Sequence, residues 1–140
     1  MEVSEVRRRV RAAIETAKQA AADRRVRNDV AARDYDLFLT HRAVPVFQQV
    51  AAALTSEGHP FKVFTPAGSV RLASDRSPEE FIELTLDTAS DPPEVRGQVS
   101  RGRGRRMISE ERPVRPQTPI ADLTDEHVLD YLTREVALLV

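Results

Sequence analysis

The chain has 140 residues, of which 41% are hydrophobic and 31% charged, and its formal net charge is −1. These values are typical of a single globular domain and exclude an intrinsically disordered chain. Because cysteine is absent, disulfides, thiolate metal sites and cysteine nucleophiles are excluded as well. No apolar run approaches the roughly 18 residues of a membrane span, and the start lacks the apolar stretch of a secretory signal. We therefore expect a cytoplasmic protein without membrane contact.

The N-terminal part is predicted to form a long helix over residues 4–39. Ser4 can cap its first turn, where the negative charge of Glu5 suits the helix macrodipole. An apolar stripe runs along this helix at spacings of three and four residues, a pattern that favours packing against another helix, including that of a second copy. The members of this candidate self-association stripe are Val6, Val10, Ala13, Ala17 and Ala20.

The length of this helix exceeds the size of an ordinary domain. At 1.5 Å per residue, residues 4–39 extend about 54 Å, whereas a domain of this size measures about 30 Å across. The regular spacing of apolar residues is interrupted over residues 23–28. Either the helix kinks there and folds back across the sheet as two shorter helices, or part of it projects and requires a partner.

A second helix is predicted over residues 44–57. Pro45 fits its first turn, where a missing N–H is tolerated, and Phe47 and Leu54 lie on its apolar face. Gly58 is well placed to end it in a left-handed conformation. Residues 1–57 are therefore expected to form a helical hairpin.

In residues 60–112 apolar and polar residues tend to alternate, and this period of two indicates β-strands. The clearest strand is 81–88, where apolar and polar residues alternate strictly. Shorter strands are expected on either side of it, separated by turns at residues 66–69, 91–93 and 101–104. An outer face exposed to solvent predicts an antiparallel sheet covered on one side only.

The C-terminal part consists of a proline-rich connector over residues 113–119 and a helix within residues 120–140. Thr124 is the expected N-cap of this helix. The complete order predicts a single α+β domain in which a helical hairpin and a C-terminal helix pack on one face of a five-strand antiparallel meander. The expected core is Phe47, Leu54, Ile82, Leu84, Leu86, Val128, Leu132 and Val136.

The segment SRGRGRR, residues 100–106, is the strongest local charge feature. Seven arginines and two glutamates lie in residues 95–115, directly after residues 75–94 with seven acidic residues and one arginine. Three interpretations stay open: arginines that finish a hairpin by pairing with an acidic strand, a phosphate-binding tip for nucleic acid, or a contact for an acidic protein. In the first, Arg96 lies across from Glu83 and Asp87. The candidate contacts are Arg101, Arg103, Arg105 and Arg106, with residues 7–11 as a second basic patch.

No constellation for catalysis, cofactor binding or metal binding is found. His41, His59 and His127 share no ligand spacing, and neither a Gly-x-Ser-x-Gly elbow nor a phosphate-binding loop occurs. We therefore expect a non-catalytic protein-interaction module, an adaptor or subunit of a bacterial-type cytosolic complex that self-associates. The alternatives are a nucleic-acid-associated protein, and a small-molecule binder or enzyme with a pocket between helices and sheet.

Overall fold

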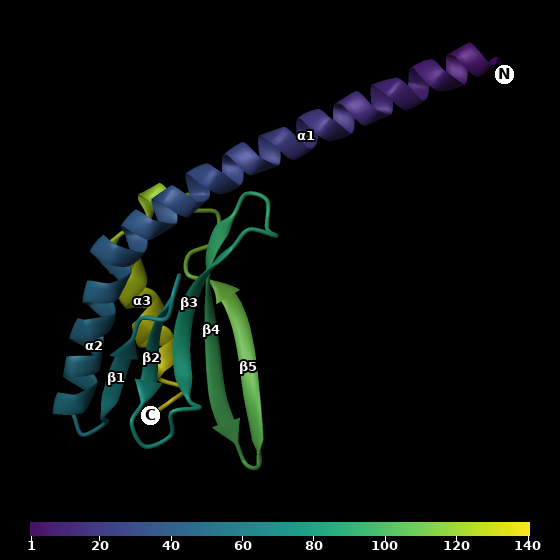
Figure 1. Ribbon diagram of the computed structural model, residues 1–140. Coiled ribbons are helices and arrows are strands. Elements are labelled where there is room, and N and C mark those ends of the chain that lie inside the picture. The colour runs from purple at the N-terminus through teal and green to yellow at the C-terminus, as the bar shows by residue number, and fades with distance from the viewer.

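The computed structural model describes all residues from 1 to 140 and shows the α+β fold that the sequence predicts (Figure 1). The helices are α1 (Val3–Phe38), the π-helical turn η1 (Leu39–Ala43), α2 (Val44–Ser56), the 3-10 turn η2 (Ile120–Asp122) and α3 (Asp125–Val136). The strands are β1 (Phe61–Phe64), β2 (Val70–Ser74), β3 (Phe81–Asp87), β4 (Glu94–Arg103) and β5 (Arg106–Pro113). None of the helices combines the length with the apolar character that crossing a membrane requires.

The two N-terminal helices form one bent arm and not the expected hairpin. The backbone stays in the right-handed helical region from α1 through η1 into α2, so no reversing loop separates them. The direction of the chain changes at η1 (Figure 1). Pro45 accounts for the location of this bend. It has no N–H to donate to the carbonyl of His41, and its ring crowds that carbonyl, so a wider helical turn is favoured just before Pro45.

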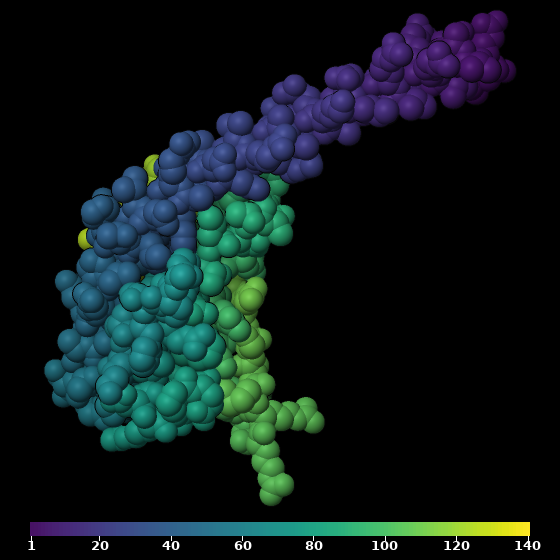
Figure 2. Space-filling view, viewed as in Figure 1, coloured from purple at the N-terminus to yellow at the C-terminus, as the bar shows by residue number.

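The alternative in which the first helix folds back as two shorter helices is wrong. α1 is unbroken over its 36 residues, and residues 23–28 lie within regular helix. Its N-terminal half projects away from the domain, whereas its C-terminal end joins the domain body (Figures 1 and 2). Burial of α1 is confined to that end, where Ala31, Tyr35 and Phe38 enter the core.

The sheet is a meander with the strand order β1-β2-β3-β4-β5, and every neighbouring pair is antiparallel. On β3 the side chains of Ile82 and Leu84 are fully buried, and that of Leu86 is partly buried. Thr85, which lies between the two leucines, points to the other face and is exposed. The helices cover one face of the sheet, and the opposite face carries polar pairs such as Arg71 with Glu83, whose Nε and Oε1 atoms are 3.1 Å apart. The one-sided sheet is therefore confirmed.

The core lies between the sheet and the helices α2 and α3. Of the eight expected core residues, five are fully buried, namely Phe47, Ile82, Leu84, Val128 and Leu132. The other three are partly buried against the same core, namely Leu54, Leu86 and Val136. The sequence did not single out Tyr35 and Tyr131, which are 3% and 0% exposed.

Candidate functional site

The projecting part of α1 has no contact partner within the chain. No side-chain hydrogen bond or ion pair joins residues 3–26 to any residue outside α1, and the first such link along the helix is Arg27 Nη1 to Asp91 Oδ1 at 2.9 Å. Figure 2 shows this segment extending beyond the body of the molecule. Most helical stability in proteins comes from tertiary packing of an apolar face, so a partner that packs along this segment would supply the missing tertiary contacts.

The exposed segment carries an uninterrupted line of apolar residues, which we call the apolar seam. Its members are Val3, Val6, Val10, Ala13, Ala17 and Ala20, which adds Val3 to the five residues predicted from the sequence. The side chains of Val3, Val6 and Val10 are 76%, 44% and 52% exposed. Spacings of three and four residues in strict alternation are those of the a and d positions of a coiled coil. The seam therefore has the pattern of a helix-pairing surface.

The apolar seam lies on the same side of α1 as the residues that enter the core. Continuing its spacing of three or four residues beyond Ala20 leads to Ala31, Tyr35 and Phe38, the three buried residues of α1. Because this period keeps residues on one helical face, a partner packed on the seam must lie on the side of the domain body. This relation decides which dimer geometries are possible.

The arginine-rich segment forms the β4–β5 hairpin, but its turn is shorter than predicted. Residues 101–103 belong to β4, and the turn consists of Gly104 and Arg105. Gly104 alone has a positive φ, 64°, at the first central position of the turn, which is the geometry that type II′ hairpins require. Gly102 pairs with Met107 within the strand ladder and has no positive φ.

The strand register places three of the four candidate arginines on one face of the hairpin. Arg103 lies opposite Arg106, and Arg101 lies opposite Ile108. Met107 therefore points to the other face, where it is 49% exposed. The sequence could not decide between these faces because either of the adjacent apolar residues 107 and 108 could have been the inward one.

Only Arg101 of the four is held by an acidic residue of the sheet, with its Nη2 3.4 Å from Glu110 Oε1. Arg103, Arg105 and Arg106 are exposed and form no ion pair. The pairing with the acidic strand that the sequence suggested is also different. Arg96 lies opposite Thr85 and binds Glu94, with Nη1 and Oε1 2.7 Å apart.

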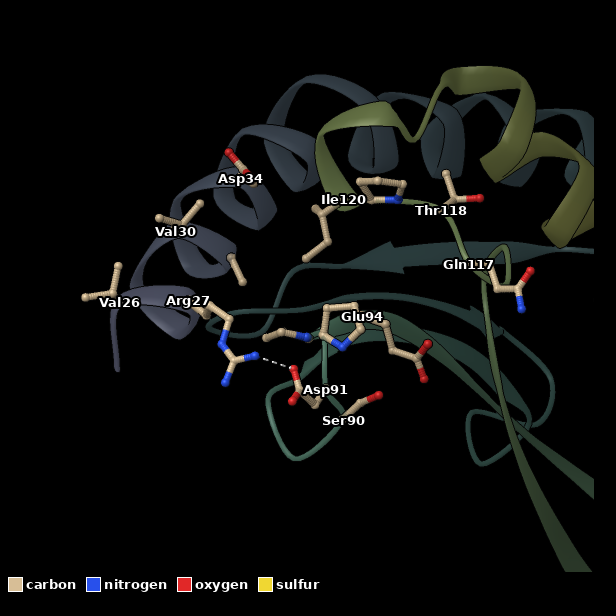
Figure 3. A pocket seen from close by; sticks show the side chains of 14 residues that line it. Val26, Arg27, Val30, Asp34, Ser90, Asp91, Glu94, Gln117, Thr118 and Ile120 are labelled. Atoms are coloured by element: carbon tan, nitrogen blue, oxygen red, sulfur yellow. Dashed lines mark hydrogen bonds and ion pairs between the residues drawn. The ribbon is translucent and has the colours of Figure 1, made fainter. Parts of the chain in front are cut away.

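A cleft of about 660 Å³ lies between α1, the β3–β4 loop and the connector before η2 (Figure 3). Its wall is largely apolar, with Val26, Val30 and Ile120 labelled in Figure 3. Its carboxylates include Asp91, which is paired with Arg27. It contains no histidine, and no group of three metal-binding side chains occurs in the protein. The cleft therefore offers a largely apolar surface for packing, with the hydroxyls of Ser90 and Thr118 among its polar groups.

Two buried polar side chains of α3, those of Tyr131 and Glu135, form a group at the contact between α3 and the sheet. Tyr131 packs directly on Gly97, where a Cβ atom would overlap its ring and hydroxyl. Burial and the nearby Glu135 raise the pKa of Tyr131 above its usual value. Glu135 is itself 2% exposed, and its Oε1 is 3.4 Å from Arg112 Nε. The closed packing around this group assigns it to the core of the fold.

Two further polar side chains, those of His127 and Tyr35, have structural roles. The backbone N–H of Thr124 donates to Nδ1 of His127 at 3.1 Å, and the N–H of His127 donates to Oγ1 of Thr124 at 3.3 Å, which completes a capping box at the start of α3. The hydroxyl of Tyr35 donates to the carbonyl of Gly68 at 2.8 Å and anchors the end of α1. His41 and His59 are exposed, and neither belongs to a group of three or more side chains that could hold a metal ion.

Two surfaces thus remain without partners inside the chain, namely the apolar seam and the three tip arginines. The seam is the larger of the two, and it accounts for a helix that is otherwise unsupported. Comparison of the chain with protein-family models, with curated proteins and with solved structures finds no significant match.

Proposed function

We propose that this protein is a non-catalytic interaction module that self-associates through the apolar seam and serves as an adaptor or subunit of a cytosolic complex. The observation that supports the proposal is the projecting half of α1, on which valines at three consecutive seam positions are exposed. Burying apolar groups contributes roughly 0.8 kcal/mol per methylene. Because association costs at least several kcal/mol, three valines and three alanines per copy favour a dimer of micromolar affinity.

Sedimentation equilibrium of the full chain from about 5 to about 500 µM tests this proposal. We expect a reversible monomer–dimer equilibrium, with the circular dichroism signal at 222 nm falling on dilution because the free arm loses helix when its partner leaves. A protein that stays monomeric, with constant helicity over the whole range, would overturn the proposal.

The tip arginines support a second candidate function, which is contact with a polyanion such as nucleic acid. Arg103, Arg105 and Arg106 are exposed, have no acidic partner, and lie next to each other at a hairpin tip. Three phosphate contacts on duplex DNA would release counterions and weaken binding roughly 40-fold between about 50 and about 200 mM salt.

Fluorescence anisotropy with labelled DNA and RNA at these two salt concentrations tests the second candidate. We expect salt-sensitive binding that is lost in Arg103→Glu/Arg105→Glu. The control Arg33→Glu/Arg115→Glu changes the net charge equally at two other exposed arginines, and it should retain most of the binding. Equal loss in both variants would indicate a general charge effect, and no binding by the wild type would exclude this function.

A further inference from the structure

We infer that the dimer is antiparallel, with residue n of one copy opposite residue 23 − n of the other along the apolar seam. This inference rests on the proposed self-association and adds the direction and register of the two helices. It follows from two independent features of α1, namely the side on which the domain body lies and the order of large and small residues along the seam.

The position of the body excludes a parallel pair. The seam and the buried residues Ala31, Tyr35 and Phe38 share one face of α1, so the domain body, including η2 and the β3–β4 loop, occupies the seam side of residues 27–38. In a parallel pair, the same stretch of the partner's helix would have to run through that body. In an antiparallel pair, the partner's helix ends before that stretch, opposite Ala20 and beneath the free half of α1, where the space is open (Figures 1 and 2).

The free length of α1 fits this arrangement. In the proposed register Val3 of one copy lies opposite Ala20 of the other, and the overlap covers residues 3–20 of both. The first link between α1 and the body is at Arg27, seven residues beyond Ala20, or about 10 Å along the helix. The two helices therefore overlap over the whole seam without reaching the β3–β4 loop.

The order of side chains along the seam selects the register. Valines occupy its N-terminal half and alanines its C-terminal half, so the register pairs Val3 with Ala20, Val6 with Ala17, and Val10 with Ala13. Each layer then contains one large and one small residue and joins an a position to a d position, as antiparallel pairs require. A parallel pair would stack valine on valine at one end and alanine on alanine at the other, which prevents a constant helix separation.

Electrostatics does not reverse this preference. In a parallel pair Glu2 of one helix would approach Arg7 of the other, which is attractive. An exposed ion pair contributes at most about 1 kcal/mol, however, and it cannot offset a steric overlap with the domain body. The two bodies of the dimer are therefore expected at opposite ends and on opposite sides of a short two-helix rod.

Disulfide cross-linking tests the inference, and the absence of native cysteine leaves no background. Full-length Val3→Cys and Ala20→Cys proteins are oxidised separately and as a mixture. We expect the mixed 3–20 disulfide to exceed both self-linked products at least 10-fold, because residues 3 and 3 of the two copies are separated by about 25 Å along the rod. Val3→Cys mixed with Ala13→Cys controls for a shift of one heptad.

The outcomes separate the inference from the proposed function. Strong self-linking of Val3→Cys would overturn the antiparallel direction, and a dominant 3–13 product would overturn the register, while self-association through the seam would stand in both cases. A dimer detected by sedimentation without any of these cross-links would place the interface elsewhere and overturn both. A monomer in sedimentation would also overturn both.

Discussion

Replacing Val6 and Val10 together by glutamate is expected to raise the dissociation constant of the dimer at least 100-fold, which corresponds to about 2.7 kcal/mol. In the proposed dimer both valines pack against alanines of the partner helix. The variant would place four carboxylates in this interface without counter-charges, and burial of unpaired charge is strongly unfavourable. Sedimentation equilibrium measures the change directly.

The variant Ser4→Glu/Ala12→Glu is the matched control. It adds the same charge to the same exposed segment, but residues 4 and 12 lie outside the seam. We expect a dissociation constant within about threefold of the wild type, in line with the small effect of exposed charges. Equal weakening by both variants would show that charge density on the arm, and not the seam, controls association. No weakening by either would place the interface on another surface.

Gly97→Ala is expected to lower the free energy of unfolding by about 3 kcal/mol, at the upper end of the range for overpacking in a core. The added Cβ would overlap the hydroxyl, Cζ and Cε1 of Tyr131. The ring has no room to move because Tyr131 is fully buried. Urea denaturation, with the midpoint and slope analysed together, measures the loss.

Gly102→Ala on the same strand is the control for a general effect of removing glycine. Its Cβ would lie 3.1 Å from Glu80 Oε1, the end of a flexible side chain that can turn away. We expect a change below about 1 kcal/mol. Adding Tyr131→Phe to Gly97→Ala removes the closest overlapping atom and should restore part of the stability. Equal effects of the two glycine substitutions, or no coupling between residues 97 and 131, would contradict the assigned contact.

The local periodicity of the sequence was sufficient to predict most of the fold. The alternation around Ile82 and Leu84 predicted the central strand and its buried face, because successive side chains of a strand point to opposite sides. Thr124 predicted the start of α3, and Gly58, with φ of 92°, ends α2 as expected. These signals act over a few residues, so they do not depend on the rest of the chain.

Features that depend on contacts between distant segments could not be predicted in the same way. Which face of the hairpin carries the arginines depends on whether residue 107 or residue 108 points inward, and this is decided by the register of β5 with β4. The role of Tyr131 depends on its packing against Gly97, 34 positions away. Neither residue carries a sequence signal for the other, because a glycine in a strand can serve a bulge, a turn or a close approach.

The sequence by itself determined that the chain has a long N-terminal helix, an apolar stripe along it, and a cluster of arginines in a hairpin. Helix period and turn composition are local properties, and they are read directly from residue order. Only the tertiary structure decided that the stripe is uncovered. The bend at η1 directs α2 onto the sheet while α1 projects, which leaves the seam exposed and on the side of the body. Whether a stripe is core or interface depends on what lies beside it, and that is fixed by the path of the whole chain.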